Sequence, residues 1–161
     1  MYQERPMDKL TLEQLLDKAI AREEEAYDFY KALLKKIEDA TARDALGFLA
    51  EEEKKHKEFL IAYKRGDYAE KGLRMSEVID YKIAQHMDKP DPEKDIETKD
   101  VYLVAAHREL NSYNFYSGLA EVQPEGEVKQ MLMRMAGEEM KHKEKVEYLY
   151  ANTAFPQTQG G

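Results

Sequence analysis

The chain has 161 residues, a formal net charge of −8 and 36% charged residues. This length is typical of one domain with a hydrophobic core. The acidic charge argues against a nucleic-acid partner, because phosphate binding requires clustered lysine and arginine. No apolar run reaches transmembrane length, and the N-terminal residues lack the apolar stretch of a signal peptide. Cysteine is absent, which excludes disulfides and rubredoxin-type iron centres from this chain, and we expect a cytoplasmic protein with no membrane partner.

A first pair of helices is predicted from apolar side chains at helical spacing, over about residues 12–37 and 41–64. Thr11 can cap the first helix, with Gln14 three residues later completing a capping box. Gly66 is a stop signal for the second helix. Because only a few residues connect the two helices, the pair should form an antiparallel hairpin.

A second pair is predicted over about residues 98–122 and 125–150, with Pro124 near the start of its second helix. The crossover between the pairs, residues 65–97, should contain a short helix over about 76–87. Two helical hairpins joined by one long crossover predict an all-α, ferritin-like four-helix bundle.

We therefore expect a single ferritin-like domain over residues 1–150, in which two repeated hairpins cover about 11–64 and 98–150. Residues 151–161 show no periodicity and should form a disordered tail.

The two hairpins repeat each other in sequence. Residues 19–63 align without a gap to residues 105–149, with 15 identities in 45 positions. The residues shared by the two hairpins include a Glu-x-x-His motif, at Glu53 to His56 and again at Glu139 to His142. Such a repeat predicts two hairpins that present the same polar groups.

Polar side chains interrupt the apolar stripe of each predicted helix near its middle. Four unpaired carboxylates in one core would be strongly unfavourable, and two divalent cations would neutralise them. Carboxylate and imidazole groups suit iron and manganese, and they can also bind zinc. One Glu from each of two helices and a Glu-x-x-His motif from each of the others is typical of di-iron and di-manganese carboxylate proteins. The predicted metal ligands are Glu23, Glu53, His56, Glu109, Glu139 and His142.

Other polar residues lie near these positions. Tyr30 and Tyr116 each follow a predicted ligand by seven residues, and they could hydrogen-bond the ligand carboxylates, donate an electron or simply pack in the core. Glu51, Glu52 and Glu138 are expected on exposed faces, although one of them could support a path by which iron enters.

The sequence resembles the rubrerythrin-like branch of the ferritin-like superfamily over about residues 12–150. The matching motifs are Glu23-x-x-Ala26-x-x-x-Tyr30, Glu53-x-x-His56, Glu109-x-x-x-x-x-x-Tyr116 and Glu139-x-x-His142. The resemblance implies bridging roles for Glu53 and Glu139, terminal roles for Glu23 and Glu109, and one imidazole per iron from His56 and His142.

Two departures from typical rubrerythrins stand out. This chain has no rubredoxin domain, so an external electron donor such as a rubredoxin-like protein would be needed. Ser112 occupies the position where such proteins carry an additional glutamate ligand, and its counterpart in the first half is Ala26. The predicted site is therefore nearly symmetric.

The resemblance implies two bound iron ions, with manganese or zinc as alternatives, and reduction of hydrogen peroxide or O₂ as the reaction. A ferroxidase, or a protein of iron storage or trafficking, is the first alternative. A di-iron hydroxylase and a di-manganese catalase are further alternatives. We expect a homodimer, because half-bundle repeats with a long crossover favour pairing.

Overall fold

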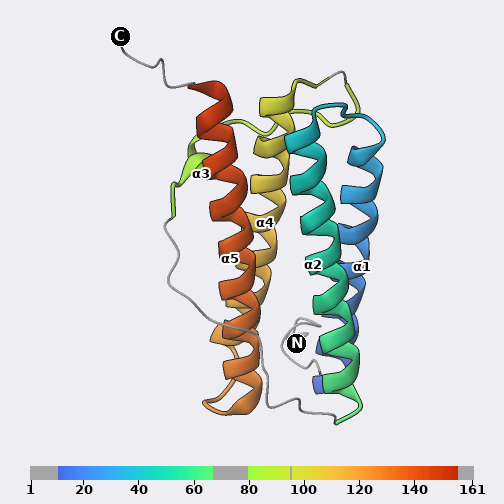
Figure 1. Ribbon diagram of the computed structural model, residues 1–161. Coiled ribbons are helices and arrows are strands. Elements are labelled where there is room, and N and C mark those ends of the chain that lie inside the picture. Colours follow the sequence, from blue (N-terminus) through green and yellow to red (C-terminus); the bar gives the residue numbers. More distant parts are fainter. Residues whose placement is uncertain (1–10, 67–79, 95, 156–161) are drawn as a thin grey trace, which may run out of the picture. The chain divides into compact units, whose positions relative to one another are not determined.

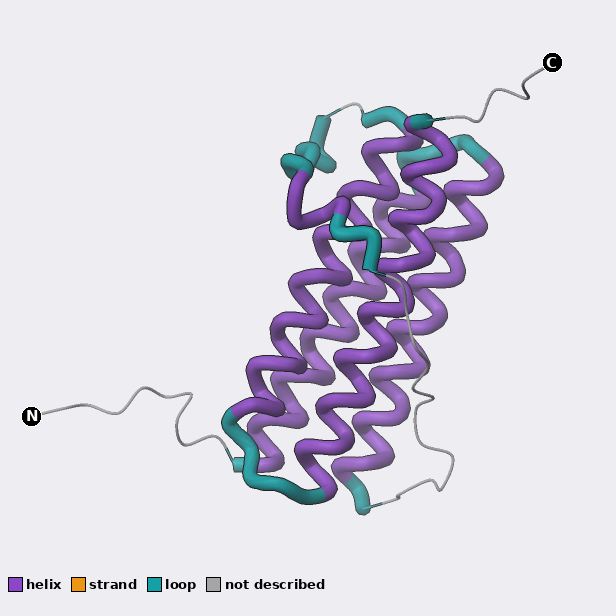
Figure 2. Tube along the Cα trace, turned by 90° about the vertical axis from the view of Figure 1, so that its left-hand side faces the viewer, coloured by secondary structure: helices purple, strands orange, loops and turns teal. Residues whose placement is uncertain are grey.

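The computed structural model describes residues 11–66, 80–94 and 96–155. These residues form five α-helices and no strand (Figure 1, Figure 2). The predicted all-α class is therefore confirmed. The helices are α1 (Leu12–Leu34), α2 (Ala40–Lys64), α3 (Ile83–His86), α4 (Thr98–Glu121) and α5 (Glu127–Ala154).

The described residues divide into two compact units. One unit holds α1 and the part of α2 from Leu46 onward, and the other holds residues 36–45 together with α3, α4 and α5. The first unit therefore carries the first Glu-x-x-His motif, and the second unit carries the other. The single ferritin-like domain over residues 1–150 stays a prediction.

In the first unit, α1 begins at the predicted capping box. The Gln14 backbone N–H donates to Thr11 Oγ1 at 3.1 Å, and the Thr11 backbone N–H donates to Gln14 Oε1 at 3.0 Å. These bonds satisfy backbone donors that the first helical turn leaves without partners. At the end of α2, Gly66 has a φ of 85°, the left-handed conformation that terminates many helices.

The connection between α1 and α2 differs from the prediction, because α1 ends at Leu34 rather than near residue 37. Ile37 is buried outside the helix, and the Arg43 guanidinium donates to its carbonyl oxygen at 2.9 Å. Asp39 Oδ2 accepts the backbone N–H of Ala42 at 2.9 Å, which caps the start of α2. The apolar spacing in the sequence thus extends beyond the end of α1, because Ile37 is buried although it lies in a loop.

In the second unit, α4 and α5 lie side by side (Figure 1). A capping box between Glu97 and Asp100 starts α4, and residues 101–106 are buried on every face of the helix. His107 on α4 hydrogen-bonds through Nε2 to the carbonyl oxygen of Met87, just after α3, at 2.8 Å. The short helix of the crossover is therefore attached to α4.

Two further boundaries differ from the sequence-based expectation. The helix α5 begins at Glu127 and continues to Ala154, past the expected end near residue 150. The crossover helix α3 covers Ile83–His86, which is shorter than the predicted 76–87. Residues 76–79 lie outside the described residues. Within the described ranges, no helix is both long and apolar enough to cross a membrane.

Candidate metal centre

The first unit brings three predicted ligands together, and we call Glu23, Glu53 and His56 the first triad. Glu23 lies on α1, and the other two lie three residues apart on one face of α2. His56 Nδ1 is 3.7 Å from Glu23 Oε2 and 3.8 Å from Glu53 Oε2. The three residues offer ligand atoms within 4.8 Å of one another, and all three are buried.

The second unit repeats this arrangement with Glu109, Glu139 and His142, which we call the second triad. Glu109 lies on α4, and the other two lie on α5. His142 Nδ1 is 3.5 Å from Glu109 Oε2. These residues also offer ligand atoms within 4.8 Å of one another and are buried. Each half of the sequence repeat therefore supplies two carboxylates and one imidazole.

Burial changes the acid–base properties of the first triad. Removal from water, together with the adjacent Glu53 carboxylate, raises the pKa of Glu23 to about 8, although the His56 ring acts in the opposite direction. At neutral pH without a cation, Glu23 therefore holds a proton. A bound cation would favour the ionised carboxylate and displace this proton.

The residues of both triads fit a metal ion of the iron or manganese class. Two carboxylates and one imidazole are oxygen and nitrogen donors suited to these metals. Each triad combines donors from two helices, so that helix packing sets the donor positions. The buried positions of the carboxylates are also unfavourable without a compensating positive charge. The assignment of the six residues as ligands stays a prediction.

Tyr30 and Tyr116 are buried at equivalent positions of the repeat, on α1 and α4. Each ring packs edge-on against the preceding phenylalanine, with centroid distances of 5.7 Å for Phe29 and 5.1 Å for Phe115. An edge-on arrangement is one of the preferred geometries of aromatic pairs. Core packing thus accounts for the burial of both tyrosines, and their roles beside the metal ligands stay predictions.

Sequence reasoning missed a buried charged cluster on α5. The Lys143 side chain is 0% exposed, and Lys143 Nζ donates to Glu147 Oε1 at 2.8 Å and to Asp80 Oδ1 at 2.6 Å. Glu147 Oε2 accepts the backbone N–H of Ala84 at 2.7 Å. The i, i+4 spacing of Lys143 and Glu147 was visible in the sequence, but such pairs usually lie on solvated helix faces. The expectation that Glu138 is exposed was also wrong, because it is buried.

The Rubrerythrin family model matches residues 4–64 of this chain, which include the first triad. Among solved structures, a hypothetical protein from Pyrococcus furiosus is similar, with 25% sequence identity and a TM-score of 0.62. That alignment covers 96% of this chain and 99% of the other. Among curated proteins, no relative matches the chain. The family match confirms the predicted rubrerythrin-like character, the structural match agrees with a ferritin-like helical fold, and the buried Glu and His groups suggest a di-iron protein.

Proposed function

Starting from this rubrerythrin-like character, we propose that the chain is a di-iron carboxylate redox protein that reduces hydrogen peroxide, or O₂, with electrons from an external donor. The observation that carries the proposal is the duplicated triad, because each half of the chain buries two carboxylates and one imidazole within 4.8 Å. Burial of such groups is unfavourable unless a cation or a proton compensates them.

From the resemblance to rubrerythrins, we propose that the six predicted ligands hold two iron ions. By that resemblance, Glu23 and His56 would serve one ion, Glu109 and His142 the other, and Glu53 and Glu139 would be shared carboxylates. Four carboxylates would then neutralise two divalent cations. Reduction of hydrogen peroxide to two water molecules consumes two electrons and two protons, and two ferrous ions would supply the electrons.

The side chains of this protein have separate tasks in the proposed reaction. The carboxylates and imidazoles fix the position of the cations and tune their charge. Glu23, whose pKa is raised to about 8 by burial and by Glu53, can hold a proton on its carboxylate when the cation is absent. We propose that the hydroxyl groups of Tyr30 and Tyr116 hydrogen-bond the ligand carboxylates.

The test is anaerobic loading with Fe(II), followed by addition of hydrogen peroxide. We expect about two iron ions per chain, and consumption of one peroxide for every two ferrous ions oxidised. Glu53→Ala should abolish both results, whereas the exposed Glu51→Gln should preserve both. Absence of bound iron in the native protein would contradict the proposal.

Iron storage is the main competing function, and the same experiment separates it from peroxide reduction. Incorporation of many more than two iron ions per chain, in a large cage-like assembly, would favour storage. We expect a homodimer by size-exclusion chromatography with light scattering. Turnover that continues when a reduced electron donor is added would favour the peroxide reductase.

A further inference from the structure

A second carboxylate precedes the ligand glutamate in each half of the repeat. Glu52 precedes Glu53, and Glu138 precedes Glu139, at equivalent positions of the two halves. Each of these two outer glutamates also lies four residues before the ligand histidine, on the same side of its helix. The proposed ligand set makes no use of them. Because these two glutamates recur together with the histidines in both halves, we expect their function to be related to the triads.

The two carboxylate oxygens of Glu138 on α5 lie in different surroundings. Glu138 is 8% exposed, and its Oε1 atom is buried and has no hydrogen-bond partner in the described part of the chain. Its other oxygen, Oε2, lies 3.7 Å from Lys141 Nζ, and the Lys141 side chain is 33% exposed. One oxygen of this carboxylate is therefore in the interior, while the other faces a partly solvated ammonium group.

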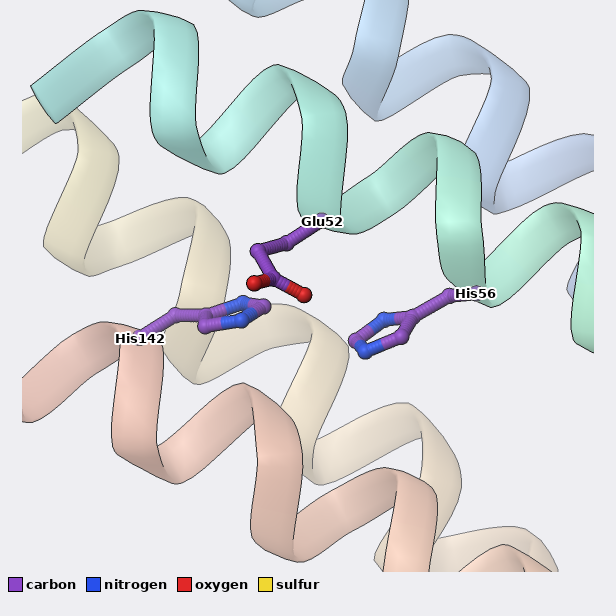
Figure 3. Close-up of side chains that lie close together, drawn as sticks. All are labelled: Glu52, His56 and His142. Atoms are coloured by element: carbon purple, nitrogen blue, oxygen red, sulfur yellow. The ribbon is translucent and has the colours of Figure 1, made fainter. Parts of the chain in front are cut away.

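Glu52 on α2 has an equivalent lysine contact in the first unit, although its side chain is 23% exposed. Its Oε1 atom lies 3.9 Å from Lys55 Nζ, the repeat equivalent of Lys141. Glu52 and His56 offer ligand atoms within 4.8 Å of each other. Figure 3 shows both side chains projecting from the same side of α2, with the Glu52 carboxylate directed toward the His56 ring. The outer carboxylate thus lies beside a residue of the first triad.

The lysine contacts of the two outer glutamates are weak. Separations of 3.7 and 3.9 Å exceed hydrogen-bond length, and partly exposed ion pairs contribute little stability. A divalent cation carries twice the charge of an ammonium group and binds carboxylate oxygen directly. An arriving cation can therefore replace the lysine, whose flexible side chain then moves into solvent.

We propose that Glu52 and Glu138 receive divalent cations from solvent and pass them to the triad of their own half. This inference rests on the proposed function, because it requires that the triads bind metal. The outer glutamates act before the final binding step, as transient ligands. The lysines partly neutralise the carboxylates until a cation arrives.

The test uses Co(II) as the probe, because its absorption spectrum changes when it moves from water to a site of oxygen and nitrogen ligands. Uptake by the metal-free full-length protein is followed by stopped-flow absorption. In the double variant Glu52→Gln/Glu138→Gln we expect uptake to slow by about tenfold or more, because focused negative charge accelerates cation binding. The final Co(II) stoichiometry should stay at that of the native protein.

A matched control removes the same charge from the same two helices without touching the outer glutamates. Glu51 on α2 and Glu127 on α5 are exposed, so Glu51→Gln/Glu127→Gln should keep the native uptake rate. A second variant, Lys55→Met/Lys141→Met, should increase the uptake rate, because it removes the competing ammonium groups. Slower uptake in Glu52→Gln/Glu138→Gln and faster uptake in Lys55→Met/Lys141→Met cannot both result from a general loss of structure.

The outcomes separate this inference from the proposed function. Native uptake rates in the Glu52→Gln/Glu138→Gln variant, or a slower rate in the lysine variant, would overturn the inference and leave the metal centre intact. A reduced final stoichiometry would also overturn it, because the outer glutamates would then be permanent ligands. No Co(II) binding by the native protein would overturn the proposed metal centre itself. Circular dichroism spectra of all variants establish that the helices form.

Discussion

The lysine that follows the predicted ligand histidine is partly exposed in one half of the chain and fully buried in the other. Lys57 Nζ lies 3.5 Å from Glu24 Oε1, and their side chains are 32% and 58% exposed. Lys57 also lines a surface pocket of the first unit. Lys143, its repeat equivalent, is 0% exposed and bonds both Glu147 and Asp80. The same residue in the same motif therefore has two different structural roles.

The difference arises from residues outside the repeated motif. Position 61 of the first half holds isoleucine, whereas its equivalent in the second half is Glu147. Asp80 and Ala84 belong to the crossover, which supplies the remaining partners of the cluster in the second unit. The crossover thus supplies a carboxylate partner to Lys143, and it attaches the start of α3 to α5. The sequence repeat predicts the same ligand residues in both halves. It does not predict which half receives additional partners from the crossover.

The largest effect on folding is expected for Lys143→Met. The substitution leaves the buried carboxylate of Glu147 without its ammonium partner, and loss of one member of a buried ion pair costs about 3–5 kcal/mol. Urea denaturation of the metal-free protein measures the change in the free energy of unfolding. An effect no larger than that of Lys57→Met would contradict the distinction between the two halves.

The next effect concerns the pH dependence of the first triad. Burial and the neighbouring Glu53 raise the pKa of Glu23 from 4.5 to about 8, so the folded chain holds a proton that the unfolded chain releases between these pH values. Stability of the metal-free protein should therefore decrease as pH rises through this window.

Glu23→Gln cannot release that proton, and it serves as the control. The difference in unfolding free energy between native protein and variant, measured by urea denaturation from pH 5 to pH 8, isolates the contribution of Glu23. We expect the native protein to lose stability relative to the variant across this range. A constant difference would show that Glu23 keeps an ordinary pKa in the metal-free state.

The smallest effect is expected for Lys57→Met. Its ion pair with Glu24 is largely solvated, and such pairs contribute about 0–1 kcal/mol. Metal content should not change, because Lys57 belongs to neither triad. The same urea titration measures the stability. A loss close to that of Lys143→Met would show that Lys57 is part of an unrecognised buried cluster.

The sequence was sufficient to predict the all-α class and the positions of the long helices, because apolar spacing and capping residues are local signals. The predicted ligands stood out because Glu23 and Glu109 interrupt apolar stripes at equivalent positions. The end of α1 could not be predicted, because the burial of Ile37 depends on tertiary contacts. Glu138 and Lys143 were missed for the same reason, since helical periodicity does not show how wide the buried face is or where the crossover lies.

Elemental analysis of His56→Ala and His142→Ala beside the native protein, after gentle purification or Fe(II) loading, tests the central claim most directly. If each half supplies one imidazole to one of two irons, the native protein should hold about two iron ions per chain. Either substitution should then reduce this number to about one or fewer, by equal amounts. A native protein without metal, or a variant that keeps the full native content, would contradict the duplicated metal centre.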